Sequence, residues 1–341
     1  MNRRLVSDSL LTAGWIPAIL FFGILAHCSL KASPRGEACR LSSAVAEALS
    51  GLGREKSQAL VRIHCQDNTG EIIGTGFLID PAGTVCTLTD FVRGGTSLSI
   101  ESDGKSFPAS LLSADDRTGI AFLRTSVTAP SFIPPFPSAI LTESSPVAAL
   151  APATSQESAT TVPLLGVTGA RIDHDKERFF PLPLITALLP TPGSKPGTPV
   201  FDLSGKFAGI VVRSNAADYS CAILPASAVE KLHSDLLRFG KPNPGWIGAV
   251  VEESAVPEGT SRTRIAGVEP GSPAERAGIL PGDSLLAIDH RSITLPQEVL
   301  EASFYLTAGQ EVRLVLARSG EIKRVTLRCA AAPGEAFLSQ Q

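Results

Sequence analysis

The stretch IGTGFLIDPAGTVCTLTDFV, residues 73–92, decides the fold of this chain of 341 residues. Aliphatic and β-branched runs lie on both sides of the turn DPAG, a pattern typical of two strands joined in a hairpin. Another such run, ALVRIHCQ, precedes this stretch and is separated from it by the turn DNTG. Successive hairpin-linked strands of this kind predict the opening of a β-barrel.

The composition agrees with a folded, mainly β protein of about two domains. Hydrophobic residues make up 43% of the chain and charged residues 18%, which excludes disorder as its main state. The 30 Gly and 26 Pro suit short strands joined by many turns. A net charge of −3 lacks the basic excess that phosphate backbones attract, so no nucleic-acid partner is expected. The cysteines and histidines lack the spacing of a zinc site, and neither a metal nor a cofactor is expected.

Residues 1–32 are predicted to direct export. Arg3 and Arg4 precede the uncharged run Ser9–Ala26, an order typical of a secretory signal peptide. The run is also about long enough to span a bilayer, so an uncleaved N-terminal membrane anchor is the alternative. Contact with a membrane is expected only through this segment. Residues 33–55 are assigned to an N-terminal extension.

Export also bears on the cysteines, because an oxidising compartment allows disulfides. Cys65 and Cys86 fall on neighbouring predicted strands and are candidates for one bridge. Buried free thiols are the preferred interpretation.

Four segments resemble, in the right order, motifs of the HtrA-like (HtrA/Deg) serine proteases, trypsin-like proteases of the bacterial envelope. The stretch 73–92 is similar to the strand pair around the catalytic histidine, and SADDRTGIAFLRT to the segment whose aspartate orients it. PGSKPGTPVFDLSGKFAGIVV resembles the nucleophile loop, and SCAILPASAVEKLHSDLLRFG the closing strand and helix, with Gly240 as its C-cap. The resemblance implies a mainly β, two-lobed trypsin-like β-barrel domain over residues 56–240.

The same resemblance places Asp90, Gly119 and Pro196 at the three catalytic positions. An aspartate is too acidic to be an efficient base at neutral pH, and a glycine has no side chain with which to orient a base. Pro196 lacks both the nucleophilic hydroxyl and the backbone N–H that this position gives to the oxyanion hole. The chain is therefore predicted to be a catalytically inactive family member, a pseudoprotease.

A rearranged catalytic site is the alternative. Ser194 precedes the nucleophile position by two residues, and His174 lies in the charged loop HDKER, so this pair could serve an active endopeptidase. Asp115 and Asp116 are adjacent, and adjacent side chains of an extended segment point to opposite sides. We interpret the two carboxylates as part of a solvated turn.

The segment GVEPGSPAERAGILPGDSLLAIDHRSI resembles the core of a bacterial PDZ domain. It predicts an α+β PDZ domain over residues 241–332, followed by a tail at residues 333–341. The helix PQEVLEASFYL is expected to begin at a capping box formed by Thr294 and Gln297.

The stretch PGWIGAVVEE is similar to the carboxylate-binding loop and adjoining strand of PDZ domains. This likeness implies that its backbone binds a peptide C-terminus, with the peptide added as a further strand. The residues expected to bind are Gly245, Trp246, Ile247, Gly248, Ala249 and Val250. An ordinary edge strand with a buried Trp246 is the alternative.

These inferences predict an exported pseudoprotease that is periplasmic or anchored to the membrane. It would bind peptide C-termini or unfolded proteins, or regulate an active partner protease, and further copies of the same chain are candidate partners. An active endopeptidase with a rearranged site and a purely structural envelope protein are the two alternative functions.

Overall fold

The computed structural model describes residues 35–332 except 69, 128–130, 153–160, 162, 173–180, 192, 216 and 259–260. The chain divides into two compact units, Met1–Glu47 and Ala48–Gln341. The predicted signal peptide or anchor lies outside the described residues. Within the described ranges, no helix combines the length and hydrophobicity needed to cross a bilayer. Helix α2 (Arg35–Lys56) covers most of the predicted N-terminal extension and is followed by the short helix η2 (Ser57–Ala59).

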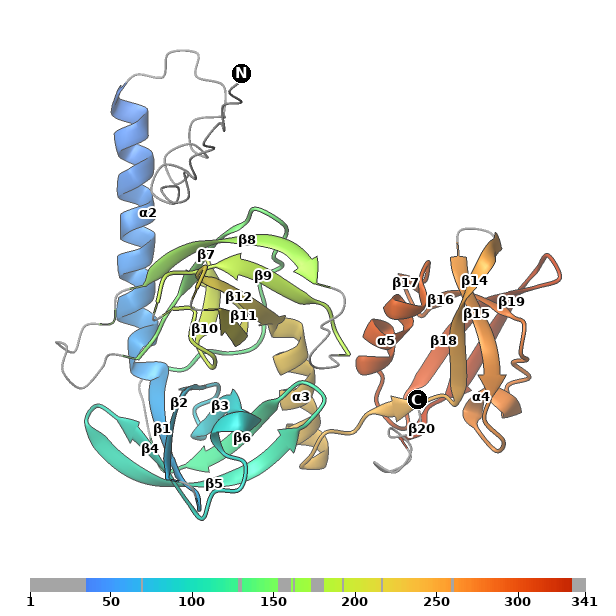
Figure 1. Ribbon diagram of the computed structural model, residues 1–341, viewed down its shortest axis with the longest axis horizontal. Coiled ribbons are helices and arrows are strands. Elements are labelled where there is room, and N and C mark those ends of the chain that lie inside the picture. The colour runs from blue at the N-terminus through green and yellow to red at the C-terminus, as the bar shows by residue number, and fades with distance from the viewer. Residues whose placement is uncertain are drawn as a thin grey trace, which may run out of the picture. The chain divides into compact units, whose positions relative to one another are not determined.

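Strands β1 to β6 form a closed barrel in the order β1-β2-β3-β6-β5-β4, and all neighbours are antiparallel (Figure 1). The two predicted hairpins are present, since β1 pairs with β2 and β2 with β3. The bounds are β1 (Leu60–Gln66), β2 (Glu71–Leu78), β3 (Thr84–Leu88), β4 (Ser97–Ser102), β5 (Lys105–Asp115) and β6 (Ile120–Thr125), with the short helix η3 (Thr89–Phe91) after β3.

A second closed barrel follows, in the order β10-β11-β12-β9-β8-β7. Its strands are β7 (Pro146–Ala149), β8 (Leu164–Ile172), β9 (Leu184–Leu188), β10 (Pro199–Asp202), β11 (Phe207–Asn215) and β12 (Ser220–Pro225). Helix α3 (Ala226–Phe239) comes next and ends as predicted at Gly240, whose φ is 75° and whose N–H donates to the Leu236 carbonyl over 2.9 Å. The two barrels confirm the predicted two-lobed trypsin-like domain.

The cysteines of the described core are buried free thiols. Cys65 and Cys86, the candidates for a disulfide, are not bonded to each other, and Cys221 and Cys329 are likewise free. Burial raises the pKa of the Cys86 thiol well above its ordinary value, because the charged thiolate loses its hydration inside the barrel. The structure therefore confirms the preferred interpretation of buried free thiols for these four residues.

The C-terminal part is an α+β domain, as predicted. Its main sheet has the order β14-β15-β16-β18-β19, and β17 pairs with β16 beside this path. A two-stranded sheet of β13 and β20 joins the two ends of the domain. The bounds are β13 (Gly245–Trp246), β14 (Ala249–Glu258), β15 (Ser261–Val268), α4 (Pro273–Arg276), β16 (Ser284–Ile288), β17 (Arg291–Ser292), α5 (Pro296–Phe304), β18 (Glu311–Arg318), β19 (Glu321–Arg328) and β20 (Ala330–Ala331).

The start of α5 differs from the predicted capping box. The N-cap is Leu295, and the Glu298 carboxylate accepts the N–H groups of Thr294 and Leu295 over 2.6 and 3.1 Å. Thr294 therefore precedes the N-cap by one residue, and Glu298, at the third helical position, takes the role expected of Gln297. The local pattern predicted the correct helix but the wrong capping pair, because the Glu298 carboxylate, one residue further along the chain, also reaches backbone donors at the helix start.

Helix α5 also contacts elements of the barrel domain. Phe304 is 3% exposed and belongs to an apolar cluster that includes buried residues of both barrels and of α3. The hydroxyl of Tyr305 lies 2.8 Å from that of Ser227 on α3, and the Arg117 guanidinium lies 5.2 Å from the centre of the Phe304 ring. Cutting the C-terminal domain from the chain would expose this packed surface.

Candidate functional site

The loops that carry Asp90 and Gly119 are hydrogen-bonded to each other. Asp90 lies exposed in η3, directly after β3. The N–H of the preceding Thr89 donates to the Gly119 carbonyl over 2.8 Å, and the Gly119 N–H donates to the Asp115 carbonyl over 2.8 Å. Gly119 has a φ of +74°, a conformation that glycine adopts without strain. The first two predicted positions are therefore adjacent in space.

Pro196 lies in a turn that precedes β10. The Thr198 N–H donates to the Lys195 carbonyl over 3.2 Å, and the Gly197 N–H donates to Val211 over 2.8 Å. Both donors are thereby used within the fold, and proline itself has no N–H. An oxyanion needs donors that are free and aimed at one point, so this loop offers poor support for one.

Phe91 brings the Pro196 loop against the η3 loop. A Cβ added at Gly74 would lie 2.3 Å from the Phe91 ring, and one added at Gly197 would lie 3.0 Å from it. The two glycines therefore leave room for this ring between β2 and the loop that precedes β10. The structure thus brings Asp90, Gly119 and Pro196 into one region, although they are far apart in the sequence.

The other candidate catalytic residues do not form a described pair. Ser194 is 5% exposed, which leaves its hydroxyl little access to a substrate, and His174 lies outside the described residues. Asp116 is exposed and pairs with Arg93. Asp115, in contrast, is buried and accepts hydrogen bonds from the Thr118 N–H and hydroxyl and from Arg117. The interpretation as a solvated turn is therefore wrong for Asp115, which organises the turn that leads to Gly119.

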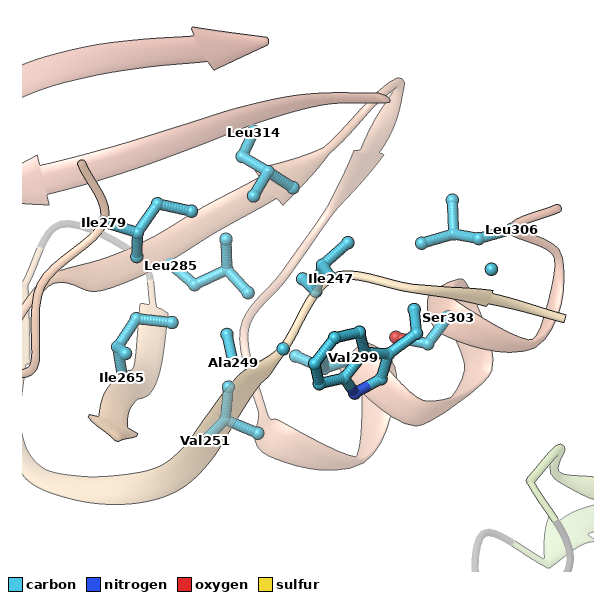
Figure 2. Close-up of a pocket in the computed structure, with 13 residues that line it drawn as sticks. Ile247, Ala249, Val251, Ile265, Ile279, Leu285, Val299, Ser303, Leu306 and Leu314 are labelled. Atoms are coloured by element: carbon cyan, nitrogen blue, oxygen red, sulfur yellow. The ribbon is translucent and has the colours of Figure 1, made fainter. Parts of the chain in front are cut away.

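An apolar cavity of about 100 Å³ lies between β14 and α5. Figure 2 shows Ala249 and Val251 of β14 near the α5 residues Val299 and Ser303, with further aliphatic side chains from β15, β16 and β18 around them. One water needs roughly 10–15 Å³ on such a measure, so the cavity can hold one large aliphatic or aromatic side chain. The lining residues are Gly245, Trp246, Ile247, Gly248, Ala249, Val251, Ile265, Ile279, Leu285, Val299, Ser303, Leu306 and Leu314.

The loop between β13 and β14 presents backbone donors beside this cavity. Among the described residues, the N–H groups of Ile247 and Gly248 donate to no backbone carbonyl, whereas the carbonyls of both residues accept from Ala274 and Glu269. Gly248 has a φ of +79°, and a Cβ there would lie 2.2 Å from the Ser272 Cβ. The position therefore requires glycine, and both donors remain available for an acceptor such as a carboxylate.

Strand β14 is one edge of its sheet, and β19 is the other. An edge strand has unpaired backbone groups to which a peptide can be added. Five of the six residues predicted to bind line the cavity, and the sixth, Val250, does not. Its neighbour Val251 does, because successive side chains of a strand point to opposite faces. The alternation of side chains along the strand, counted from Ala249, was the sequence signal that could have identified Val251 as a lining residue. The helix PQEVLEASFYL forms the opposite wall of the cavity.

An ion pair holds the turn that leads into β16 beneath the cavity. Asp283 is 1% exposed, and its carboxylate accepts two hydrogen bonds from Arg318, over 2.5 and 2.6 Å, and one from the Leu280 N–H over 2.9 Å. Burial alone would raise the pKa of this carboxyl, but the hydrogen bonds outweigh it and hold the pKa below its ordinary value. The pair fixes the chain between the lining residues Ile279 and Leu285.

Two family models match the chain in the order of the two folds. Residues 74–210 match the trypsin-like peptidase domain, and residues 264–318 match the PDZ domain. Two similar curated proteins are both called probable periplasmic serine endoprotease DegP-like. The one from Halomonas elongata is 25% identical over 75% of this chain, and the one from Marinomonas sp. is 26% identical over 77%. These matches span 56% and 58% of the relatives, so the chain covers little more than half their length.

Solved structures of HtrA-type proteases share the fold. The protease AlgW with a decapeptide superposes with a TM-score of 0.64 at 17% identity, covering 85% of this chain and 99% of that one. A serine endoprotease from Yersinia pestis superposes with a TM-score of 0.57 at 18% identity, covering 83% of this chain and 98% of that one. The chain has a trypsin-like double barrel followed by a PDZ domain, and it is similar in sequence to DegP-like proteases and in fold to HtrA-type proteases.

Proposed function

We propose that this protein is an exported HtrA-like pseudoprotease that binds peptides or unfolded proteins through its PDZ groove. The observation that carries the proposal is the groove itself, an apolar cavity beside an edge strand and two N–H groups that donate to no backbone carbonyl of the described residues. The relatives' names support a periplasmic location, and the decapeptide in the AlgW structure supports peptide as the ligand class. A partner in regulation would be an active protease of the same compartment.

The residues at the three predicted catalytic positions support the inactive part of the proposal. The positions predicted for the base, the orienting group and the nucleophile are occupied by Asp90, Gly119 and Pro196. These residues lie in one region of the barrel domain. A serine protease needs a hydroxyl, a base and oxyanion donors together. The burial of Ser194 counts against a rearranged nucleophile.

Peptide binding should depend on a free C-terminal carboxylate. We expect a labelled peptide ending in leucine to bind the full chain weakly, and its C-terminal amide to bind at least about tenfold more weakly. The reason is that the Ile247 and Gly248 N–H groups lose a charged acceptor, and hydrogen bonds to charged groups contribute about 1.5–3 kcal/mol. Fluorescence polarisation of both peptides measures the difference. The full chain is used because Phe304 is packed against barrel residues.

A variant can test the cavity in the same assay. Ser303→Phe should abolish binding by filling the space between α5 and β14, whereas Leu300→Phe, on the exposed side of the same helix, should bind like the wild type. Gly248→Leu is unsuitable, because its side chain would collide with Ser272 and its φ is positive. Equal binding of acid and amide peptides would contradict the carboxylate loop and leave the groove as a packing surface.

Restoring the three catalytic residues alone should give little activity. The variant carrying Asp90→His, Gly119→Asp and Pro196→Ser keeps Ser194 and Thr198 in its nucleophile loop. Thr198 is fully buried, and its hydroxyl has no hydrogen-bond partner among the described residues. This bulk should prevent the turn that presents the nucleophile and the oxyanion donors. Release of fluorescence from labelled casein measures the activity.

Adding Ser194→Gly and Thr198→Gly to the triple variant should raise that activity, because a more flexible loop can turn its N–H groups toward the cleft. Efficient turnover by the triple variant alone would contradict this prediction. It would mean that the loop presents its donors correctly despite the substitutions.

A further inference from the structure

The last described strand ends beside the groove. β20 is antiparallel to β13, with Ala330 opposite Trp246 and Ala331 opposite Gly245, and the Ala332 N–H donates to the Pro244 carbonyl over 3.3 Å. Trp246 and Gly245 both line the cavity. The chain that follows Ala332 therefore starts next to residues of the groove.

The sequence of this following segment, residues 333–341, is PGEAFLSQQ. Because β20 is antiparallel to β13, it runs away from the carboxylate loop, and a turn is needed to bring the chain back. Pro333 and Gly334 form a dipeptide that favours a turn. Phe337 and Leu338 follow, the two large apolar residues of the segment.

The segment is long enough to reach the cavity. The four steps from residue 333 to residue 337 span up to about 14 Å when extended, whereas the three steps from Gly245 to Gly248 span at most about 11 Å. The turn can shorten the segment and still leave Phe337 within reach. The cavity accepts one large apolar side chain, and the Ile247 and Gly248 N–H groups can bind a backbone carbonyl of an internal segment.

We propose that residues 333–341 occupy the PDZ groove of their own chain, with Phe337 or Leu338 in the cavity, and compete with other peptides. This inference rests on the proposed peptide-binding function of the groove. A short tether gives a millimolar effective concentration, so even a weak internal ligand competes measurably. A peptide that binds the groove from solution would then have to displace residues 333–341.

Two readouts test this in the full chain carrying Trp15→Phe, which leaves Trp246 as its single tryptophan. One variant ends at Ala332, and another carries Phe337→Ser and Leu338→Ser. Both should bind a peptide ending in free leucine about threefold to tenfold more tightly than the parent chain. Acrylamide should also quench Trp246 fluorescence more efficiently in both variants, because the indole lines the cavity that the tail covers.

A chain carrying Ser339→Ala and Gln340→Ala is the matched control and should behave like the parent. Equal affinity and equal quenching in all four chains would overturn the inference. A difference that grows with protein concentration would also overturn it, because the tail would then bind a second copy. If no chain binds the peptide, the proposed function fails, and unequal quenching still shows that the tail covers the groove.

Discussion

Purified protein should leave unfolded casein intact, and a fluorophosphonate probe should label none of its serines. Loss of a complete catalytic triad lowers kcat by about 10⁶, and loss of one oxyanion donor lowers it by about 10²–10³. This chain has Pro196 where the resemblance requires both the hydroxyl and the donor. Turnover should therefore lie many orders of magnitude below that of an active family member assayed alongside.

Contaminating proteases are the main source of error in this assay. A Pro196→Ala variant purified in the same way is the matched control, and any casein cleavage should be equal in the two preparations. Probe labelling of Ser194, or cleavage present in the wild type and absent from a Ser194→Ala variant, would contradict the prediction. Either result would establish the rearranged endopeptidase instead.

Asp283→Ala should lower the free energy of unfolding of the PDZ part by about 3 kcal/mol. The substitution removes the acceptor of the two Arg318 hydrogen bonds and of the Leu280 N–H. Urea unfolding followed by the fluorescence of Trp246, in the Trp15→Phe chain, measures the change. Arg313→Ala on the exposed face of β18 is the control and should unfold at nearly the wild-type urea concentration.

The effect of Asp283→Ala should depend on pH with a definite sign. The folded protein holds the pKa of Asp283 below its ordinary value, so this carboxylate contributes its full stabilisation above the unfolded pKa of about 3.9. The stabilisation is lost as the pH falls through the lower, folded pKa. The difference between wild type and variant should therefore be largest near neutral pH and shrink below about pH 4. A difference that is constant down to pH 2 would exclude the ion pair as its source.

Local sequence was sufficient for most of the fold. The turns DPAG and DNTG and the runs around them predicted the first hairpins of the barrel, because turn chemistry and side-chain alternation act over a few residues. Local sequence also predicted the end of α3 at Gly240 and the core of the PDZ domain. The capping pair of α5 was missed, because Glu298 and Gln297 were both close enough to the helix start and only the folded backbone selects between them.

The sequence by itself also predicted, through the resemblance, that Asp90, Gly119 and Pro196 stand at the three catalytic positions. Only the tertiary structure decided that their loops lie together, through the Thr89–Gly119 hydrogen bond and the Phe91 ring. It also decided that Asp115 is buried and that Cys65 is a free thiol. The cavity is also a feature that only the tertiary structure decided, because its walls come from β14, β15, β16, β18 and α5. Spacing along a chain fixes neighbours within one element, whereas contacts between elements depend on how whole surfaces pack.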